Sequence, residues 1–149
     1  MILDLNMDKE QLIALVNQKS GGFNRHNGVR IVDFTEDCVT VEAEITPEAQ
    51  NPMGMAHGGF VYTLCDVAAG VALRLGGRTG VTLSSNMYFL HRSEGNFLRC
   101  EAKIVKPGSK VVVLDTCVYD NAGEMTARGI FEVYIVMEES PEEAVRNSR

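Results

Sequence analysis

The spacing of hydrophobic positions changes along the chain from a helical period to an alternating one. Asp8 to Gln11 has the composition of a helix N-terminal capping box, and an apolar stripe of leucine, isoleucine and valine follows it. The glycine pair Gly21-Gly22 is expected to end that helix. From Val29 onward apolar and polar residues alternate in two segments joined near residues 35–37, which is typical of half-buried strands.

An apolar segment in the middle of the chain predicts a long buried helix. It follows a loop rich in glycine and proline (residues 51–59), runs from Phe60 to about Leu75, and is followed by Gly76-Gly77. Thr63, Asp66 and Arg74 interrupt it. We therefore expect this segment to be too short and too polar to span a bilayer.

Four strand-like runs complete the chain, at residues 81–90, 97–105, 111–119 and 125–137. Their connections have hairpin-turn compositions, so we predict four consecutive hairpin-linked strands of an antiparallel sheet. The long helix must bury itself on a face of that sheet. The predicted fold is α+β, a curved antiparallel sheet wrapped around one long central helix with an additional N-terminal helix. Residues 1–149 form a single domain, with a flexible tail predicted at residues 138–149.

Composition and charge exclude several classes of function. The chain has 14 basic and 20 acidic residues, a net charge of −6, which argues against nucleic acid as a partner. Its four cysteines lie far apart without a Cys-x-x-Cys pair, and its three histidines lack metal-ligand spacing, so no metal site is expected. The acidic start lacks the basic region of a signal peptide, so we expect a cytoplasmic protein with reduced thiols and no membrane partner.

Asp66 is the first candidate for chemistry. It is the one carboxylate between Phe60 and Leu73, and no lysine or arginine lies three or four residues away to pair with it. An isolated carboxylate in a buried helix is costly unless something compensates its charge. Asp66 is therefore a candidate general base or nucleophile. The alternative is that it caps a loop or pairs with a distant arginine.

The start of the same helix is a second candidate. Gly58 and Gly59 follow His57, and glycine lets a ligand approach the backbone without a Cβ in the way. The unpaired N–H groups of a first helical turn suit a developing oxyanion. The alternative is that the two glycines only permit close packing and that His57 is an ordinary loop residue.

The spacing of these two candidates bears on assembly. Gly58 and Asp66 are eight residues apart, which in an α-helix is roughly 12 Å of rise. One carbonyl cannot contact both groups of the same chain. If both act on one carbonyl, the second group must come from another copy across a two-fold interface, so a dimer is predicted on that condition.

The motif Asn51-x-x-Gly54-x-x-His57-Gly58-Gly59-x-x-x-x-Leu64-x-Asp66 resembles that of hotdog-fold acyl-CoA thioesterases of the phenylacetate-pathway (PaaI-like) type. The likeness covers roughly residues 28–137, including Gly80-Val81-Thr82 and Asn86-Met87-Tyr88. It implies a homodimer, or a dimer of dimers, with active sites at the dimer interface. It also implies an acyl-CoA substrate and hydrolysis without a cofactor, because CoA is part of the substrate.

The resemblance also implies residue roles. Asp66 is the general base or nucleophile, and the Gly58 N–H of the partner polarises the thioester carbonyl, with Gly59 in the same substrate-binding turn. Asn51 orients the carbonyl or the water, and His57 lies near the sulfur.

Two further groups of residues complete the predicted site. Thr82 occupies the position of a hydroxyl that holds the attacking water, and from the sequence Ser84 is equally suitable. Binding of the phosphates of CoA requires a local group of cationic side chains, even though the chain as a whole is negatively charged. We expect Lys106 and Lys110 to flank the turn Pro107-Gly108-Ser109, with Arg92 and Arg99 behind them. The alternative is a solvated hairpin with surface lysines. The predicted binding residues are Arg92, Lys106, Gly108, Ser109 and Lys110.

Two other functions stay open at this point. Hotdog domains also serve hydratases and dehydratases of acyl thioesters, which pair a histidine with an acidic residue, and fold alone does not decide between them. A non-catalytic acyl-CoA-binding protein would keep the same pocket. The acyl group, and whether CoA or an acyl carrier protein carries it, are also open.

Overall fold

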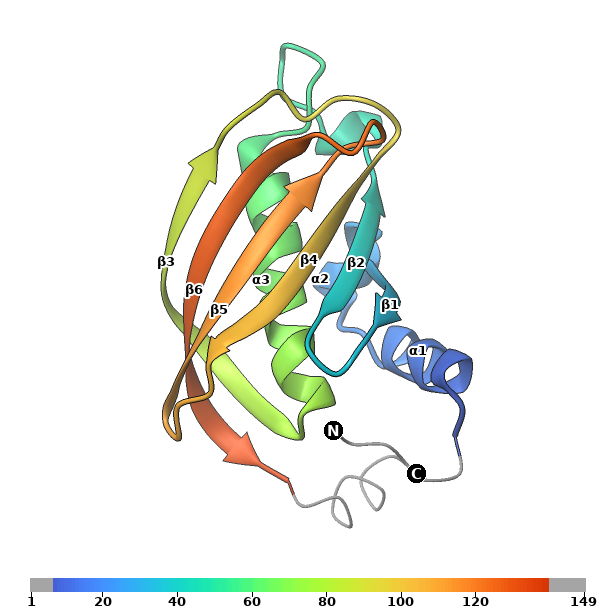
Figure 1. The fold of residues 1–149 in the computed structure, drawn as a ribbon. Coiled ribbons are helices and arrows are strands. Elements are labelled where there is room, and N and C mark those ends of the chain that lie inside the picture. Colours follow the sequence, from blue (N-terminus) through green and yellow to red (C-terminus); the bar gives the residue numbers. More distant parts are fainter. Residues whose placement is uncertain (1–6, 140–149) are drawn as a thin grey trace.

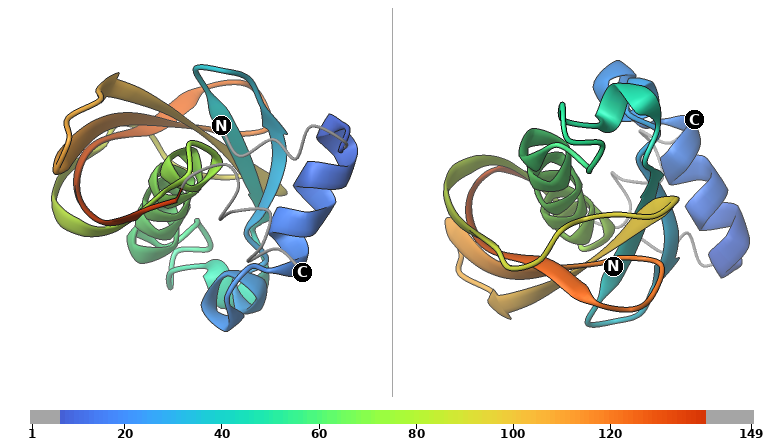
Figure 2. Two further views of the ribbon diagram at one scale, coloured as in Figure 1. Left: turned by 90° about the horizontal axis from the view of Figure 1, so that it is seen from below. Right: turned by 90° about the horizontal axis from the view of Figure 1, so that it is seen from above.

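The computed structural model describes residues 7–139. In chain order the elements are α1 (Lys9–Gln18), α2 (Gly22–His26), β1 (Arg30–Phe34), β2 (Val39–Glu44), a short 3-10 helix (Pro47–Ala49), α3 (Gly58–Leu75), β3 (Arg78–Phe89), β4 (Phe97–Lys106), β5 (Val111–Tyr119) and β6 (Met125–Glu138). The sheet curves across α3, and α1 and α2 lie beside β1 and β2 (Figure 1). The two end views show the sheet wrapped around α3 (Figure 2).

All six strands form one antiparallel sheet in the order β1-β2-β4-β5-β6-β3. The predicted antiparallel sheet around a central helix is confirmed. Of the three predicted hairpins that link the last four strands, β4–β5 and β5–β6 are confirmed, whereas the prediction of β3–β4 was wrong. β3 pairs with β6, β4 pairs with β2, and residues 90–96 cross from one edge of the sheet towards the other (Figure 1). Turn composition indicates where a chain leaves a strand, but it does not specify the next partner.

The central helix α3 is positioned at both ends by its sequence. His57 caps its N-terminus and Gly76 its C-terminus, and Gly77 follows with a φ of 79°, a conformation that favours glycine. The predicted helix is confirmed, although it begins two residues earlier, at Gly58. Its buried residues face the sheet: Phe60, Val61, Leu64, Cys65, Ala68, Ala69, Leu73 and Leu75.

By length and composition α3 is also able to cross a membrane, because its 18 residues have a mean hydropathy of 1.3. The buried core helix of a soluble protein passes the same test, so the prediction that this segment does not span a bilayer stays a prediction. In this fold α3 packs against β2, β3, β4 and β5, as expected for an apolar core helix.

The N-terminal region holds one element that was not predicted. The capping box at the start of α1 is confirmed, because Asp8 and Gln11 exchange side-chain and backbone hydrogen bonds. However, α1 ends at Gln18, and Gly21 is the N-cap of the short helix α2 rather than the end of the first. A five-residue helix is too short to produce a hydrophobic period.

Asn17 attaches α1 to the edge of the sheet. Its side-chain amide donates to the carbonyl of Ile31 at 2.9 Å, and its Oδ1 accepts from the Ile31 N–H at 2.8 Å. Lys9 forms an ion pair with Asp33, and this contact lowers the pKa of the Asp33 carboxyl. The outward N–H and C=O of β1 at Ile31 are thereby satisfied by a side chain.

All four cysteines are free thiols in this structure. Cys65 of α3 and Cys100 of β4 are fully buried with their Sγ atoms 3.9 Å apart, and burial raises the pKa of the Cys100 thiol well above its usual value. At the other end of the chain β6 continues to Glu138, one residue into the predicted tail. The rest of that tail, from residue 140, lies outside the described residues.

Candidate active site

Asp66 lies in the middle of α3 and faces the start of β3. The Thr82 hydroxyl donates a hydrogen bond to Asp66 Oδ1 at 2.5 Å. Within residues 7–139, Asp66 Oδ2 makes no hydrogen bond and Asp66 forms no ion pair. The alternative that Asp66 pairs with a distant arginine was therefore wrong for the described chain. The Thr82 hydroxyl therefore holds Asp66 Oδ1, and Asp66 Oδ2 is available to contact a bound molecule.

The structure also separates the two candidate hydroxyls. Residues two apart in a regular strand face the same side, but a register shift lies between Thr82 and Ser84 where β3 pairs with β6. Ser84 consequently donates to Glu132 Oε2 at 2.6 Å, and both of these residues are exposed. The hydroxyl beside Asp66 belongs to Thr82.

His57 has a structural contact at the N-terminus of α3. Its Nδ1 accepts a hydrogen bond from the Gly59 N–H at 2.9 Å, so the ring hydrogen of the neutral imidazole lies on Nε2. His57 is therefore the helix cap and not an unattached loop residue. The Gly59 amide, which we predicted to bind substrate, is occupied by this cap.

Gly58 supplies the open amide of this turn. No described residue accepts a hydrogen bond from its N–H. A Cβ built at Gly58 would lie 3.6 Å from the Phe89 ring, an ordinary contact, so the backbone is not crowded. Phe89 was not singled out from the sequence, and no pattern marked it.

Asn51 is engaged in its own loop. Its Oδ1 accepts from the N–H groups of Met53 at 2.9 Å and Met55 at 3.2 Å. These bonds fix the turn at Gly54, whose φ is 78°, and hold the segment leading to His57. The side-chain amide of Asn51 is left as the group able to orient a ligand.

The predicted cations do not gather in one place in a single chain. Arg92 lies beyond the end of β3, where its side chain contacts Met55 and Glu94. The turn between β4 and β5 lies at the opposite end of the sheet, with Lys106 and Lys110 exposed (Figure 1). The expectation that Arg92 stands behind this turn was therefore wrong, because β3 and β4 are not neighbours.

Arg78 holds that turn in shape, a role the sequence did not reveal. Its guanidinium donates to the carbonyls of Gly108 at 2.7 Å and Ser109 at 2.9 Å. A Cβ at Gly108 would collide with the carbonyl of Val111, so glycine is required there. Gly108 and Ser109 thus have a structural reason for their presence in addition to the predicted binding role.

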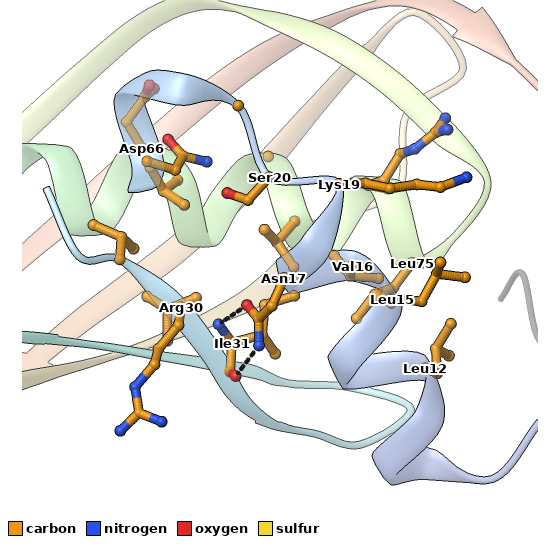
Figure 3. A pocket seen from close by; sticks show the side chains of 18 residues that line it. Leu12, Leu15, Val16, Asn17, Lys19, Ser20, Arg30, Ile31, Asp66 and Leu75 are labelled. Carbon is orange, nitrogen blue, oxygen red and sulfur yellow. Dashed lines mark hydrogen bonds between the residues drawn. The ribbon is translucent and has the colours of Figure 1, made fainter. Parts of the chain in front are cut away.

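Asp66 also lines a cavity of about 620 Å³ between α3 and the N-terminal elements (Figure 3). Ligand pockets commonly fall in the range of about 300–1,000 Å³. Its other wall is formed by residues of α1 and β1, and no pattern in the sequence marked those of β1.

Comparison with known proteins decides the family. A family model described as the thioesterase superfamily matches residues 53–127, half of the chain, including Gly58, Asp66 and Thr82. The chain belongs to the thioesterase superfamily. It is a thioester hydrolase with the hotdog fold.

Individual relatives agree with this assignment. A relative from Archaeoglobus fulgidus, whose name places it among the esterases, is 28% identical over 113 residues, 75% of this chain and 73% of its own. A Streptococcus mutans protein solved with acetyl CoA is 26% identical with a TM-score of 0.71, over 75% of this chain and 91% of that one. The E. coli PaaI protein of the phenylacetic acid degradation operon has a TM-score of 0.78 at 19% identity, over 87% of this chain and 95% of its own. The predicted hotdog fold and thioesterase family are confirmed.

Proposed function

We propose that this thioester hydrolase is an acyl-CoA thioesterase in which Asp66 is the general base or nucleophile. The observation that carries the proposal is the contact between Asp66 and Thr82. A carboxylate with one oxygen fixed by a hydroxyl and the other open, beside a ligand-sized cavity, is arranged to act on a bound molecule.

The reaction requires little apparatus. A water oxygen forms a bond to the thioester carbon while its proton passes to Asp66 Oδ2, and the carbonyl oxygen becomes an oxyanion. The C–S bond then breaks, and the thiolate of CoA takes up the proton. If Asp66 instead attacks the thioester carbon directly, the C–S bond breaks, CoA leaves as the thiolate and an anhydride forms, which water hydrolyses to the free acid and the Asp66 carboxylate. Thr82 keeps Oδ1 fixed, and its oxygen is able to accept a hydrogen bond from the attacking water.

The oxyanion is stabilised by the Gly58 N–H of a second copy. Asp66 and Gly58 of one chain lie about 12 Å apart along α3, so one carbonyl cannot reach both. The edge strand β3 favours pairing of two copies, because it exposes apolar side chains that include Val81 at 56% and Leu83 at 60%. Antiparallel pairing there brings the Gly58 end of one α3 towards the middle of the other.

The same pairing gathers the cations for CoA. In a two-fold pair the two sheets run in opposite directions. The end of one sheet, with Lys106 and Lys110, then lies beside the Arg92 end of the other sheet. Three exposed cations from two copies then surround the phosphates. The acetyl CoA bound to the Streptococcus mutans protein supports CoA as the thiol carrier.

The test of the proposed function is thiol release from a panel of phenylacetyl-, benzoyl-, short-chain and medium-chain acyl-CoA thioesters. Wild type is expected to release CoA, and Asp66→Asn, which keeps the size of the side chain, to lose about 10²–10⁴-fold in kcat, because a general base contributes that much. Folding of the variant is checked by its unfolding curve. Full turnover in a folded Asp66→Asn protein would remove Asp66 from the reaction.

A second pair of variants tests the amide of Gly58. Gly58→Pro removes its N–H at the first helical position, where proline is well accepted, and His57 already has the extended ψ of 140° that a following proline needs. Gly58→Ala keeps the N–H. We expect kcat to fall about 10²–10³-fold in Gly58→Pro, as for loss of an oxyanion donor, and to change little in Gly58→Ala.

The same panel distinguishes the two other functions. A hydratase would add water to an enoyl thioester without releasing thiol. A binding protein would take up acyl-CoA saturably without turnover. Either result in a folded wild-type protein would replace the proposal.

A further inference from the structure

The cavity beside Asp66 continues as a groove along α3. The α3 residues that line it recur at the helical period, from Asp66 through Gly70 to Arg74 and from Val67 through Val71 to Leu75. Figure 3 shows Asp66 at one end of the groove and Leu12, Leu15 and Leu75 towards the other. The groove therefore begins at the carboxylate and follows one face of the helix.

Apolar side chains from three parts of the chain form a large part of its walls, and the other polar or basic residues that line it are Asn17, Lys19, Ser20, Asn24, Arg30 and Arg74. No acidic residue other than Asp66 is among its described lining residues. The apolar ones are Leu12, Leu15, Val16, Val29, Ile31, Val41, Val67, Val71 and Leu75. Such a lining matches a hydrocarbon chain.

We propose that this groove holds the acyl chain of the substrate and that Gly70 keeps it open for chains of medium length. This inference rests on the proposed function, because it places the thioester carbonyl at Asp66. From Asp66 to Leu75 the helix rises about 13 Å. An extended chain advances about 1.2 Å per bond. About eleven bonds, which is an acyl chain of about twelve carbons, therefore reach Leu75.

Neither backbone conformation nor close packing requires a glycine at Gly70 of α3. It lies in the helix interior, where glycine is unfavourable, and its φ is not positive, so the backbone does not require it. A Cβ at this position would meet no atom within 4 Å. Any side chain there would project into open space, and that space is the groove.

Two substitutions at Gly70 separate acyl binding from folding. Gly70→Ala and Gly70→Leu fill the groove by increasing amounts and replace glycine with stronger helix formers, so neither is expected to lower the melting temperature. Ala14→Leu is the matched control, because it adds the same side chain to an exposed position of α1 that does not line the groove.

The first readout does not depend on hydrolysis. S-octyl-CoA and S-ethyl-CoA are thioethers that a thioesterase cannot cleave, and calorimetry gives their dissociation constants. Wild type and Ala14→Leu are expected to bind S-octyl-CoA about tenfold or more tightly than S-ethyl-CoA, from burial of the added methylenes. Gly70→Leu should abolish this difference while leaving S-ethyl-CoA binding unchanged.

The second readout is kcat/KM for butyryl-, octanoyl- and dodecanoyl-CoA. The preference of Gly70→Leu should shift to butyryl-CoA, with Gly70→Ala intermediate. An unchanged chain-length preference in Gly70→Leu would overturn the inference, and so would an equal loss for all lengths, which would mean that the groove holds the CoA moiety. Chain-length-dependent binding without thiol release in wild type would instead support the groove and refute the proposed function.

Discussion

The Asp66 carboxylate is held asymmetrically. Thr82 donates to Oδ1, and no described residue donates to Oδ2, so the free oxygen is aimed by the position of the held one. A hydrogen bond to a charged group contributes about 1.5–3 kcal/mol, enough to fix one rotamer of a half-buried side chain. Thr82 is in this sense a positioning residue for the base.

Replacing Thr82 tests that role. Thr82→Val removes the donor and is expected to lower kcat about ten- to hundredfold, the equivalent of the lost hydrogen bond. Because Thr82 positions the base, the KM of the thioester should change less than kcat. Thiol-release kinetics measure both constants.

Thr82→Ser is the control, because it keeps the hydroxyl and should recover most of kcat. A Thr82→Val protein with wild-type kcat would contradict the role, as would a Thr82→Ser protein as slow as Thr82→Val.

The sequence marked Asp66 correctly as a carboxylate without a local partner, but it did not choose between Thr82 and Ser84. That choice depends on one register shift in the pairing of β3 with β6. The types of the residues around such a shift do not predict it. The cap formed by His57 and the loop contacts of Asn51 were likewise not predictable from the motif. Both depend on how the chain enters α3.

At the scale of elements, periodicity predicted most helices and strands because each buries a single face. The hydrophobic pattern located the six strands and both long helices to within a few residues. It did not predict α2, which has no buried residue. It also did not predict that β3 lies at an edge, because pairing joins residues such as Phe89 and Ala127 that are distant in sequence.

The attachment of α1 to β1 gives a prediction about stability. Asn17→Ala removes both hydrogen bonds to Ile31, and we expect the free energy of unfolding to fall by about 1–3 kcal/mol. Urea denaturation measures this as a lower midpoint with an unchanged slope. The neighbouring exposed Gln18→Ala is the control and should stay within about 0.5 kcal/mol of wild type. Equal effects of the two substitutions would show that the Asn17 contact does not stabilise the fold.

At the scale of the whole molecule, the proposed shared site makes a prediction about mixed dimers. Asp66→Asn and Gly58→Pro each inactivate both sites of a homodimer. If Asp66 and Gly58 act across the interface, a mixed dimer carries one site with both defects and one intact site. Equal co-expression of the two variants should therefore restore about a quarter of wild-type activity, because half of the dimers are mixed.

If both groups acted within one chain, every site of a mixed dimer would be defective and no activity would return. Thiol release by the co-expressed proteins, against each variant alone, measures the outcome. Absence of recovery with dimers confirmed by size would refute the shared site.

The two edges of the sheet are treated differently, and this limits how copies of the chain can add to one another. At β1 the side-chain amide of Asn17 occupies the outward N–H and C=O of Ile31, whereas β3 is an edge strand with exposed apolar side chains. A sheet with one unpaired edge strand can pair only with the same edge of a second copy, and the resulting dimer has no unpaired edge left. Assembly of copies through their sheet edges then stops at two copies. If two copies pair along β3 as proposed, loss of the Asn17 contact would leave β1 as a second open edge, and we expect addition of strands to continue beyond two copies.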